Sequence, residues 1–346
     1  MHKIIIDRPG GYNRLRYQEC PDEQPKPGEI CVAVEASGVN YADCAVRWGL
    51  YESAKKFVGY PITPGFEFAG KVAALGEGVT GFEVGQDVFG VRLFGSYATQ
   101  VCVPAHQVRA LPKGWSKVQA AGFPAVFFTA YHALFQQQRL RPGMKILVHS
   151  AAGGVGTALL QLGKIAGCEM TGVVGSSHKV DTARQFGADH VIDKSTQDLW
   201  REAEKIAPEG FDVVLDANGY ATLKDSWAHV RPTGKLVIYG FHTMLPKQGG
   251  KLNWPKLIWG WIKTPRFNPI DLPNQNKSIL SFNLSFLFDR RDLFSEGMDD
   301  MLRWIAEGRI QPPATRCFPL KDAAEAHKAI ESGQSVGKLI LVSEEA

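Results

Sequence analysis

Cysteine is scarce in this sequence, and its cysteines lie far apart. The chain has six, none of them in a Cys-x-x-Cys pair: Cys20, Cys31, Cys44, Cys102, Cys168 and Cys317. This spacing excludes a structural zinc site made of four neighbouring thiolates. Because we also find no signal peptide, we expect a cytoplasmic protein with separate, reduced thiols rather than a disulfide framework.

Long apolar runs and blocks of like charge are also missing. No apolar stretch reaches about 18 residues, so we predict no transmembrane helix. The formal net charge is only +4, which is too small to indicate nucleic-acid binding. Hydrophobic residues make up 45% of the chain, so we expect a packed globular core, and the length of 346 residues suggests two domains.

The two parts of the chain follow different patterns. Residues 1–122 look rich in strands, with frequent Gly and Pro, which favours a barrel-like domain; the strands are expected at 29–36, 68–76, 85–90 and 95–103. From residue 123, strands and helices alternate, which is typical of a doubly wound parallel sheet. Its strands are expected at 145–149, 169–174, 190–193, 211–216, 234–240 and 278–286.

One strand ends in a turn of small residues that opens into a helix. The turn has the pattern Ala151-x-Gly153-x-x-Gly156, with Ala in place of a first glycine. In this strand–turn–helix context it predicts a pyrophosphate site at the helix start, formed by Ala152, Gly153, Gly154 and Val155. The alternative is an ordinary tight turn from strand to helix.

The residues after the second strand of this sheet indicate which nucleotide is bound. NAD-binding folds place an acidic residue there, but this chain has Gly175, Ser176 and, further on, Lys179. A carboxylate would repel a 2′-phosphate, whereas hydroxyl groups and an ammonium attract it, so we predict NADP(H). The alternative is that Lys179 is a solvated residue in the first turn of the next helix.

These features together resemble the medium-chain dehydrogenase/reductase superfamily over nearly the whole chain. Within it, the sequence is similar to the zinc-free quinone oxidoreductase branch and most similar to the vesicle amine transport protein subgroup. The stretches that carry the resemblance are 36–43, 47–51, 61–67, 151–156, 265–269, 281–284 and 336–339. It implies a GroES-like catalytic domain at 1–122 and 289–346, a Rossmann NADP-binding domain at 123–288, and a homodimer.

The resemblance also implies a set of site residues. Asn40 and Tyr51 would face the nicotinamide and the substrate as catalytic residues, and the remaining cofactor contacts would be Thr129, Phe282, Asn283, Leu284 and Lys338. The carboxyl ends of the fourth and fifth parallel strands predict further cofactor contacts at Asn218, Tyr239, Gly240 and Phe241. Lys194 departs from the family pattern, in which many relatives carry Tyr; this loses an expected ribose-phosphate contact, although a lysine there could still meet a phosphate.

Structural roles remain open for several of these residues. Asn40 could cap the following helix, Tyr51 could be a core aromatic, and Thr129 could lie in a helix core. Lys338 could be an exposed lysine at the start of a strand. We expect Asp43 and Arg47, one helical turn apart, to form a structural ion pair.

No metal is expected. Zinc members of the superfamily place Cys and His where this chain has Asn40 and Phe66, and no Cys or His occurs at 123–131, although His132 follows directly. Without a Lewis acid, the chemistry expected is hydride transfer from NADPH to a quinone or an α,β-unsaturated carbonyl. The alternative is a nucleotide-binding scaffold, or a lipid- or membrane-associated protein, with little turnover.

The segment 253–266 combines three Trp with Lys256, Lys263 and Arg266. It could make a weak contact with a membrane surface, where aromatic and basic residues occur together. We favour a cap over the substrate cleft or a dimer contact that buries the aromatic rings, because Pro255 and Pro265 leave a helix of only about three turns.

Overall fold

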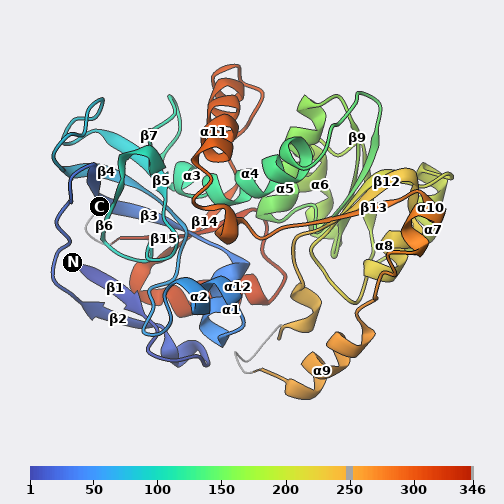
Figure 1. The fold of residues 1–346 in the computed structure, drawn as a ribbon, viewed down its shortest axis with the longest axis horizontal. Helices are drawn as coiled ribbons and strands as arrows, with labels where there is room; N and C mark the ends of the chain where they lie inside the picture. The colour runs from blue at the N-terminus through green and yellow to red at the C-terminus, as the bar shows by residue number, and fades with distance from the viewer. Residues whose placement is uncertain (247–251, 344–346) are drawn as a thin grey trace. The chain divides into compact units, whose positions relative to one another are not determined.

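The computed structural model describes residues 1–246 and 252–343. By its internal contacts the chain forms two compact units, which are described separately below (Figure 1). The first unit contains residues 1–126 and the C-terminal residues from 312, and the second contains 127–246 and 252–311. In this division, helix α11 (Arg291–Ala306) belongs to the second unit.

The first unit is built on a mainly antiparallel sheet with the order β14-β15-β3-β4-β5-β7, and β6 also pairs with β3. Its strands are β3 (Glu29–Val39), β4 (Glu67–Leu75), β5 (Asp87–Val91), β6 (Gln100–Pro104), β7 (Val108–Ala110), β14 (Thr315–Pro319) and β15 (Lys338–Val342). A separate hairpin-like pair is formed by β1 (His2–Ile5) and β2 (Arg16–Glu19). Inward-facing Val and Ile side chains of β3 pack with residues of β4, β5 and β6 to form the core.

The helices of this unit are α1 (Tyr41–Trp48), α2 (Glu52–Phe57), α3 (Lys117–Ala121) and α12 (Ala323–Glu331). Helix α4 (Pro124–Tyr131) leads out of the unit, and a π-helical turn (His132–Gln136) follows it. The C-terminal strand β15 lies beside β3, so the end of the chain completes the sheet that the first third begins. The GroES-like part of the prediction is thereby confirmed.

The second unit is a six-stranded parallel sheet with the order β10-β9-β8-β11-β12-β13. Its strands are β8 (Lys145–His149), β9 (Glu169–Val174), β10 (His190–Asp193), β11 (Phe211–Asp216), β12 (Val230–Ile238) and β13 (Ser278–Ser281). Its helices are α5 (Gly154–Ile165), α6 (Val180–Gln185), α7 (Leu199–Ile206), α8 (Leu223–Ala228), α9 (Trp254–Lys263), α10 (Asp271–Gln275) and α11. Every residue of β11 is buried, as expected for a central strand covered on both faces.

The strand order reverses between β8 and β11, which pair directly, while β9 lies on the other side of β8. Such a switch point opens a crevice at the carboxyl ends of the strands, where nucleotides bind in doubly wound folds. The predicted Rossmann sheet is therefore confirmed. Its sixth strand is shorter than the predicted 278–286, because it ends at Ser281 and a 3₁₀ turn (Leu284–Leu287) follows.

The expectation of separate thiols is wrong for two cysteines. Cys31 and Cys102 lie opposite each other on the antiparallel strands β3 and β6, with 4.0 Å between their Cα atoms, and form a disulfide. They are 71 residues apart in the sequence, so only the pairing of the two strands brings them together. The other four cysteines are free.

Candidate functional site

Three polar residues meet at one end of the sheet in the first unit. Asn40 follows the last residue of β3, Glu67 is the first residue of β4, and Lys338 is the first residue of β15. Both neighbouring strands run antiparallel to β3, with Leu339 opposite Val39 and Phe68 opposite Ser37. The starts of β4 and β15 therefore lie beside the end of β3. We call these three residues the polar triad.

The polar triad is closely hydrogen-bonded. The Lys338 ammonium lies 2.6 Å from Glu67 Oε1 and donates to Asn40 Oδ1, also at 2.6 Å. Asn40 Nδ2 donates to Glu67 Oε1 at 3.0 Å, and Glu67 Oε2 accepts from the backbone N–H of Ala125 at 2.7 Å. Glu67 is 0% exposed and Lys338 is 2% exposed, so the two opposite charges compensate each other in the interior.

Two glycines make room for this buried ion pair. A Cβ on Gly38 would lie 2.2 Å from Glu67 Oε1, and a Cβ on Gly122 would lie 2.9 Å from Lys338 Cγ. Side chains at these positions would push the pair apart. The prediction that Lys338 starts a strand is confirmed, but the alternative that it is exposed is wrong, because neighbouring strands cover it.

Asn40 also has a structural role as the N-cap residue of α1. Its backbone N–H donates to the Asp43 carboxylate, which also accepts from Gly65 N–H and from the Tyr97 hydroxyl. Asp43 is fully buried, and this burial, only partly offset by the hydrogen bonds, raises its pKa to about 7. Asn40 therefore holds the N-cap position through its backbone, while its side-chain amide belongs to the polar triad.

The expected ion pair between Asp43 and Arg47 is wrong. Arg47 instead bonds Glu331 of α12, with 2.6 Å between Nη2 and Oε1, and both side chains are 0% exposed. The guanidinium also lies over the ring of Tyr12 at 4.4 Å, and the Tyr12 hydroxyl donates to Glu331. A partner nearly 300 residues away overrides the helical spacing, because α1 packs against α12.

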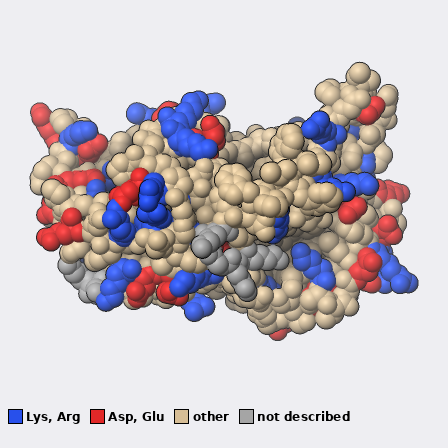
Figure 2. All heavy atoms as spheres, turned by 90° about the horizontal axis from the view of Figure 1, so that it is seen from below, with Lys and Arg blue, Asp and Glu red and all other residues tan. Residues whose placement is uncertain are grey.

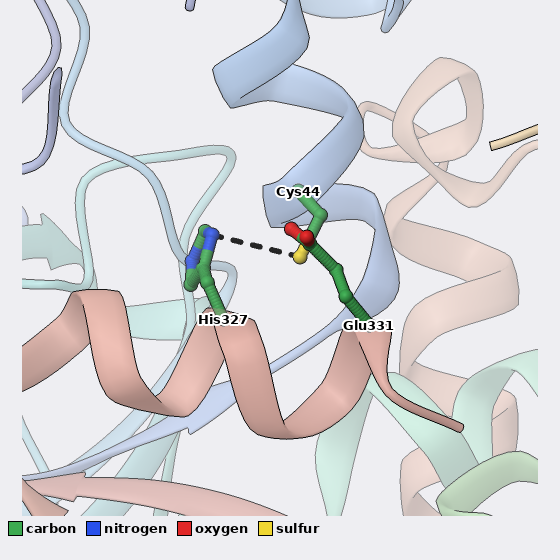
Figure 3. Close-up of side chains that lie close together, drawn as sticks. All are labelled: Cys44, His327 and Glu331. Carbon is green, nitrogen blue, oxygen red and sulfur yellow. Dashed lines mark hydrogen bonds between the residues drawn. The ribbon is translucent and has the colours of Figure 1, made fainter. Parts of the chain in front are cut away.

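Cys44, His327 and Glu331 form the one cluster of possible metal ligands among the described residues (Figure 3). Their ligand atoms lie within 4.8 Å of one another. However, Glu331 already neutralises the buried Arg47 cation, and a divalent ion there would add positive charge beside it.

Hydrogen bonding accounts for the rest of that cluster. The Cys44 sulfur lies 3.5 Å from His327 Nδ1, and the Tyr97 hydroxyl lies 3.4 Å from His327 Nε2. Burial raises the pKa of the Cys44 thiol and lowers the pKa of His327, which favours the neutral form of both. A neutral thiol donating to a neutral imidazole fits this geometry, so we assign the cluster a structural role.

Tyr51 lies at the start of α2, next to two phenylalanines. Its ring packs edge-on against Phe66 at 6.0 Å and Phe94 at 6.2 Å, and the two phenylalanine rings are 5.0 Å apart. The three rings belong to one apolar cluster of the first unit, in which Phe94 is buried.

In the second unit, β8 leads through residues 150–153 directly into α5, whose N-cap is Gly153. The first backbone N–H groups of α5 have no acceptor within the helix, which makes its start an anion-binding end. A Cβ on Gly156 would lie 2.4 Å from the Ser150 carbonyl oxygen, so only glycine allows the helix to pack this closely on the turn. These are the positions that the glycine pattern predicts.

Two lysines lie close together beyond β9 and β10. Burial, and then the nearby Lys194 ammonium, lowers the pKa of Lys179. The Lys194 Cε atom lies 3.6 Å from a Cβ position on Gly175, which places Lys194 over the end of β9. Ser177 at the same edge donates to Asp193 at 2.5 Å. Two neighbouring cations disfavour each other, so this edge favours an anion.

The loops after β8 and β11 are joined by one side-chain contact. Ser150 Oγ donates to Asn218 Oδ1 at 3.3 Å, which turns Asn218 Nδ2 away from Ser150. Asn218 is 5% exposed, and its Nδ2 has no hydrogen-bond partner among the described residues. A buried amide donor left unpaired at the switch point is the kind of group a nucleotide oxygen would satisfy.

The other predicted cofactor contacts lie on this unit as follows. The Tyr239 ring stacks parallel to Phe282 at 6.4 Å, and Phe241 lies beside Gly219 with 49% of its surface exposed. Asn283 Oδ1 accepts from Ser285 N–H and so starts the 3₁₀ turn that includes Leu284. Gly240 follows β12, and Thr129 lies in α4. Their roles toward a cofactor stay predictions.

Sequence reasoning missed one contributor to these sites and foresaw another only in part. Glu67 was part of a family-like stretch, but its ion pair with Lys338 was not expected. Lys194 was noted as a departure from the family pattern that could still meet a phosphate, but its position beside Lys179 was not expected. A charged residue at the start of a strand could have signalled the role of Glu67. The position of Lys194 beside Lys179 follows only from the parallel pairing of β9 and β10.

Comparisons with known proteins agree with this architecture. Residues 26–113 match the alcohol dehydrogenase GroES-like domain, and residues 186–341 match the family described as zinc-binding dehydrogenase. The synaptic vesicle membrane protein VAT-1 homolog of Rattus norvegicus is 32% identical over 98% of this chain and 83% of its own length. A 2-haloacrylate reductase of a Burkholderia species is 29% identical over 98% of both chains. The Escherichia coli quinone oxidoreductase complexed with NADPH has a TM-score of 0.84 at 27% identity, over 99% of this chain and 100% of its own.

Proposed function

The chain belongs to the medium-chain dehydrogenase/reductase superfamily, and from that premise we propose that it is an NADPH-dependent, zinc-independent reductase of quinones or α,β-unsaturated carbonyls. The observation that carries the proposal is the closeness of two lysines, Lys179 and Lys194, at the ends of β9 and β10. Two ammonium groups at this edge suit the extra phosphate of a phosphorylated dinucleotide. The reductase and NADPH in the names of its relatives support the same reading.

The second unit would bind the nucleotide. The start of α5 offers backbone N–H groups to the pyrophosphate, and Asn218 Nδ2 offers one more donor. Lys179 and Lys194 would hold the 2′-phosphate. When bound, NADPH supplies a hydride. The products are NADP⁺ and, after uptake of one proton from solvent, a hydroquinone or a saturated carbonyl compound.

The first unit would supply the donor to the substrate. As hydride reaches the acceptor, negative charge develops on its oxygen, and Asn40 is the half-buried amide donor of the polar triad. The Lys338 ammonium lies 2.6 Å from Glu67 Oε1 and donates to Asn40 Oδ1. Tyr51, whose ring is held edge-on by Phe66 and Phe94, would hold a flat acceptor by stacking.

The test is NADPH consumption with a panel of quinones and enones, combined with elemental analysis of the purified protein. We expect turnover with acceptors of both kinds, a preference for NADPH over NADH, and no stoichiometric zinc. Tight NADPH binding without turnover on any acceptor would refute the reductase and favour the scaffold. Light scattering would test the proposed homodimer, and cell fractionation would test the cytoplasmic location.

A second candidate function, contact with an anionic membrane surface, is favoured by α9. Its face at 254, 258, 261 and 262 is apolar and open, with Trp254 61%, Ile258 57%, Trp261 65% and Ile262 59% exposed. Gly260 on the opposite face packs against Tyr220 and Met244 and anchors the helix to its unit. The sequence analysis favoured a cap over the substrate cleft or a dimer contact that buries these rings. The exposed fractions of Trp254 and Trp261 do not support a cap that buries them within the same chain.

The charges beside α9 fit anionic lipid better than a second copy. Lys263 lies over the Trp259 ring and Arg266 over the Trp261 ring, while residues 252–270 contain no Asp or Glu. Figure 2 views the side on which α9 is drawn in Figure 1, and shows mostly uncharged surface there with Lys and Arg set into it. Two such faces brought together would oppose like charges. None of the helices described is long and apolar enough to cross a bilayer.

Vesicle co-sedimentation tests this contact. We expect binding to vesicles containing phosphatidylserine, weaker binding to pure phosphatidylcholine, and loss of binding in the double variant Trp254→Ser/Trp261→Ser. The control Phe57→Ser removes an exposed aromatic ring of the first unit, 44% exposed, and should change nothing. If the double variant instead converts a dimer into a monomer, a second copy covers α9 and the membrane contact is refuted.

A further inference from the structure

The Asn40 amide keeps one donor that the protein does not use. One Nδ2–H donates to Glu67, Oδ1 accepts from Lys338, and no other described residue accepts from this amide. Asn40 is half-buried, whereas Glu67 and Lys338 are 0% and 2% exposed. Of the three side chains, only Asn40 can therefore present a group to a bound molecule without a rearrangement of the triad.

The two bonds to Asn40 fix how its amide is turned. An ammonium can only donate, so it must face Oδ1, and a carboxylate can only accept, so it must face Nδ2. A flipped amide would set Nδ2 against the Lys338 ammonium and Oδ1 against the Glu67 carboxylate. The remaining N–H is thus held in one direction by two charged neighbours, which are themselves held by strand register and by the space at Gly38 and Gly122.

The Lys338 bond also changes the strength of that donor. It is a charge-assisted hydrogen bond of 2.6 Å in a buried environment. Positive charge at Oδ1 draws electron density through the planar amide toward oxygen and makes the Nδ2–H groups more positive. Glu67 supplies the countercharge that makes a buried ammonium tolerable.

We propose that Lys338 is a positioning residue that orients and polarises the Asn40 amide, so that its unused N–H stabilises the oxygen of the acceptor as that oxygen becomes negative. This inference rests on the proposed function. Hydride adds to carbon, the electron pair of the conjugated system moves to oxygen, and the proton that completes reduction comes from solvent, so Asn40 and Lys338 keep their protons throughout. In this way an amide held between two opposite buried charges presents a fixed N–H to the oxygen that becomes negative.

Two other roles for Lys338 predict different outcomes. If it contacts the nucleotide directly, its removal weakens NADPH binding. If the pair with Glu67 is only structural, a neutral pair of similar shape restores stability and activity together. The decisive variant is therefore Lys338→Met/Glu67→Gln, which removes both charges and leaves no uncompensated buried ion.

The kinetic experiment compares four proteins with the wild type. Lys338→Met/Glu67→Gln should lower kcat about a hundredfold, near the lower end for loss of one oxyanion donor, with an unchanged Kd for NADPH. Lys338→Arg keeps the charge and should recover most of kcat, whereas Asn40→Asp should lose at least as much as the neutral pair. The matched control Lys117→Met/Glu35→Gln removes another ion pair of the first unit and should leave kcat unchanged. Should the decisive variant not fold, Lys338→Gln/Glu67→Gln, which keeps a neutral donor at that place, replaces it.

Two further readouts separate polarisation from a structural role. Along a series of acceptors, the loss of kcat should grow as the acceptor becomes less electrophilic, because weaker acceptors depend more on stabilised oxygen charge. Independently of turnover, 4-nitrophenol with NADP⁺ should bind mainly as phenolate to the wild type and to Lys338→Arg. In Lys338→Met/Glu67→Gln and in Asn40→Asp, the absorbance of the bound 4-nitrophenol should show a ratio of phenolate to phenol about tenfold lower than in the wild type.

The results distinguish this inference from the proposed function. Unchanged kcat and phenolate ratio in a folded neutral pair would overturn the inference, and so would a raised Kd for NADPH. If the wild type reduces no acceptor but binds phenolate in a manner that depends on Lys338, the proposed reductase fails and the role of Lys338 stands. If the wild type turns over and neither readout responds to Lys338, the reverse holds.

Discussion

The two lysines at the carboxyl end of the parallel sheet give the sharpest test of nucleotide choice. Burial and the Lys194 ammonium lower the pKa of Lys179, so the two charges already oppose each other before any ligand binds. A 2′-phosphate with a charge of about −1.5 to −2 would relieve that repulsion. Each lysine–phosphate bond is worth about 1.5–3 kcal/mol, and partial exposure favours the lower end of that range.

Replacing one lysine should therefore raise the Kd for NADPH by about tenfold to a hundredfold, and should leave the Kd for NADH unchanged. The assay is titration of both nucleotides by their fluorescence with Lys179→Met, Lys194→Met and the double variant. Lys164→Met is the matched control, because Lys164 pairs with Asp189 at the far end of α5. Added salt should weaken NADPH binding more than NADH binding.

The pH dependence follows from the same shift. As pH rises through the lowered pKa of Lys179, its ammonium loses its charge, so NADPH affinity should fall while NADH affinity stays level. Phosphate binding favours the charged lysine, so complex formation at that pH should take up protons. Equal losses for NADPH and NADH in the variants, or a wild type that prefers NADH, would refute the reasoning.

Three other predictions concern the frame that holds the sites. Arg47→Met or Glu331→Gln alone should lower the free energy of unfolding by about 3–5 kcal/mol, and the double variant by clearly less; equal losses in urea denaturation would contradict a buried ion pair. The pKa of about 7 for Asp43 lies above its value in the unfolded chain, so its contribution to stability is largest at low pH. That contribution should fall by on the order of 4 kcal/mol as pH rises from about 4 through 7. Calorimetry at several pH values would measure the difference in unfolding free energy between the wild type and Asp43→Asn. A difference that stays constant with pH would contradict this prediction. Gly156→Ala places a methyl group against the Ser150 carbonyl and should cost about 1–3 kcal/mol and weaken nucleotide binding; normal values for both would disprove the tight packing.

Local sequence patterns predicted the elements of the second unit well, because each element forms from one continuous stretch of the chain. A buried run, a glycine turn and a helix are consecutive in the sequence, and they became β8, residues 150–153 and α5. The strands β9, β10 and β11 have the predicted bounds, whereas β12 begins at Val230 and ends at Ile238 instead of spanning the predicted 234–240. Where the prediction failed, at 278–286, a short strand and a 3₁₀ turn share one apolar stretch, and periodicity cannot divide it.

Contacts between distant segments escaped that reasoning. The helical spacing of Asp43 and Arg47 predicted an ion pair, but a buried partner on α12 offers Arg47 a bond in a drier environment. Cys31 and Cys102 are equally unremarkable in the sequence, and they meet only because β6 pairs with β3. The exposed face of α9 could be read as buried or open, and only the packing of Gly260 decided which face points outward.

By itself, then, the sequence determined the class of fold and the glycine turn, since each depends on neighbours along the chain. Tertiary structure decided that Lys338 is buried beside Asn40 and Glu67, and that Lys194 lies near Lys179. The physical reason is strand register: adjacent strands bring together residues hundreds of positions apart, and the charges that meet there are visible only once the strands have paired.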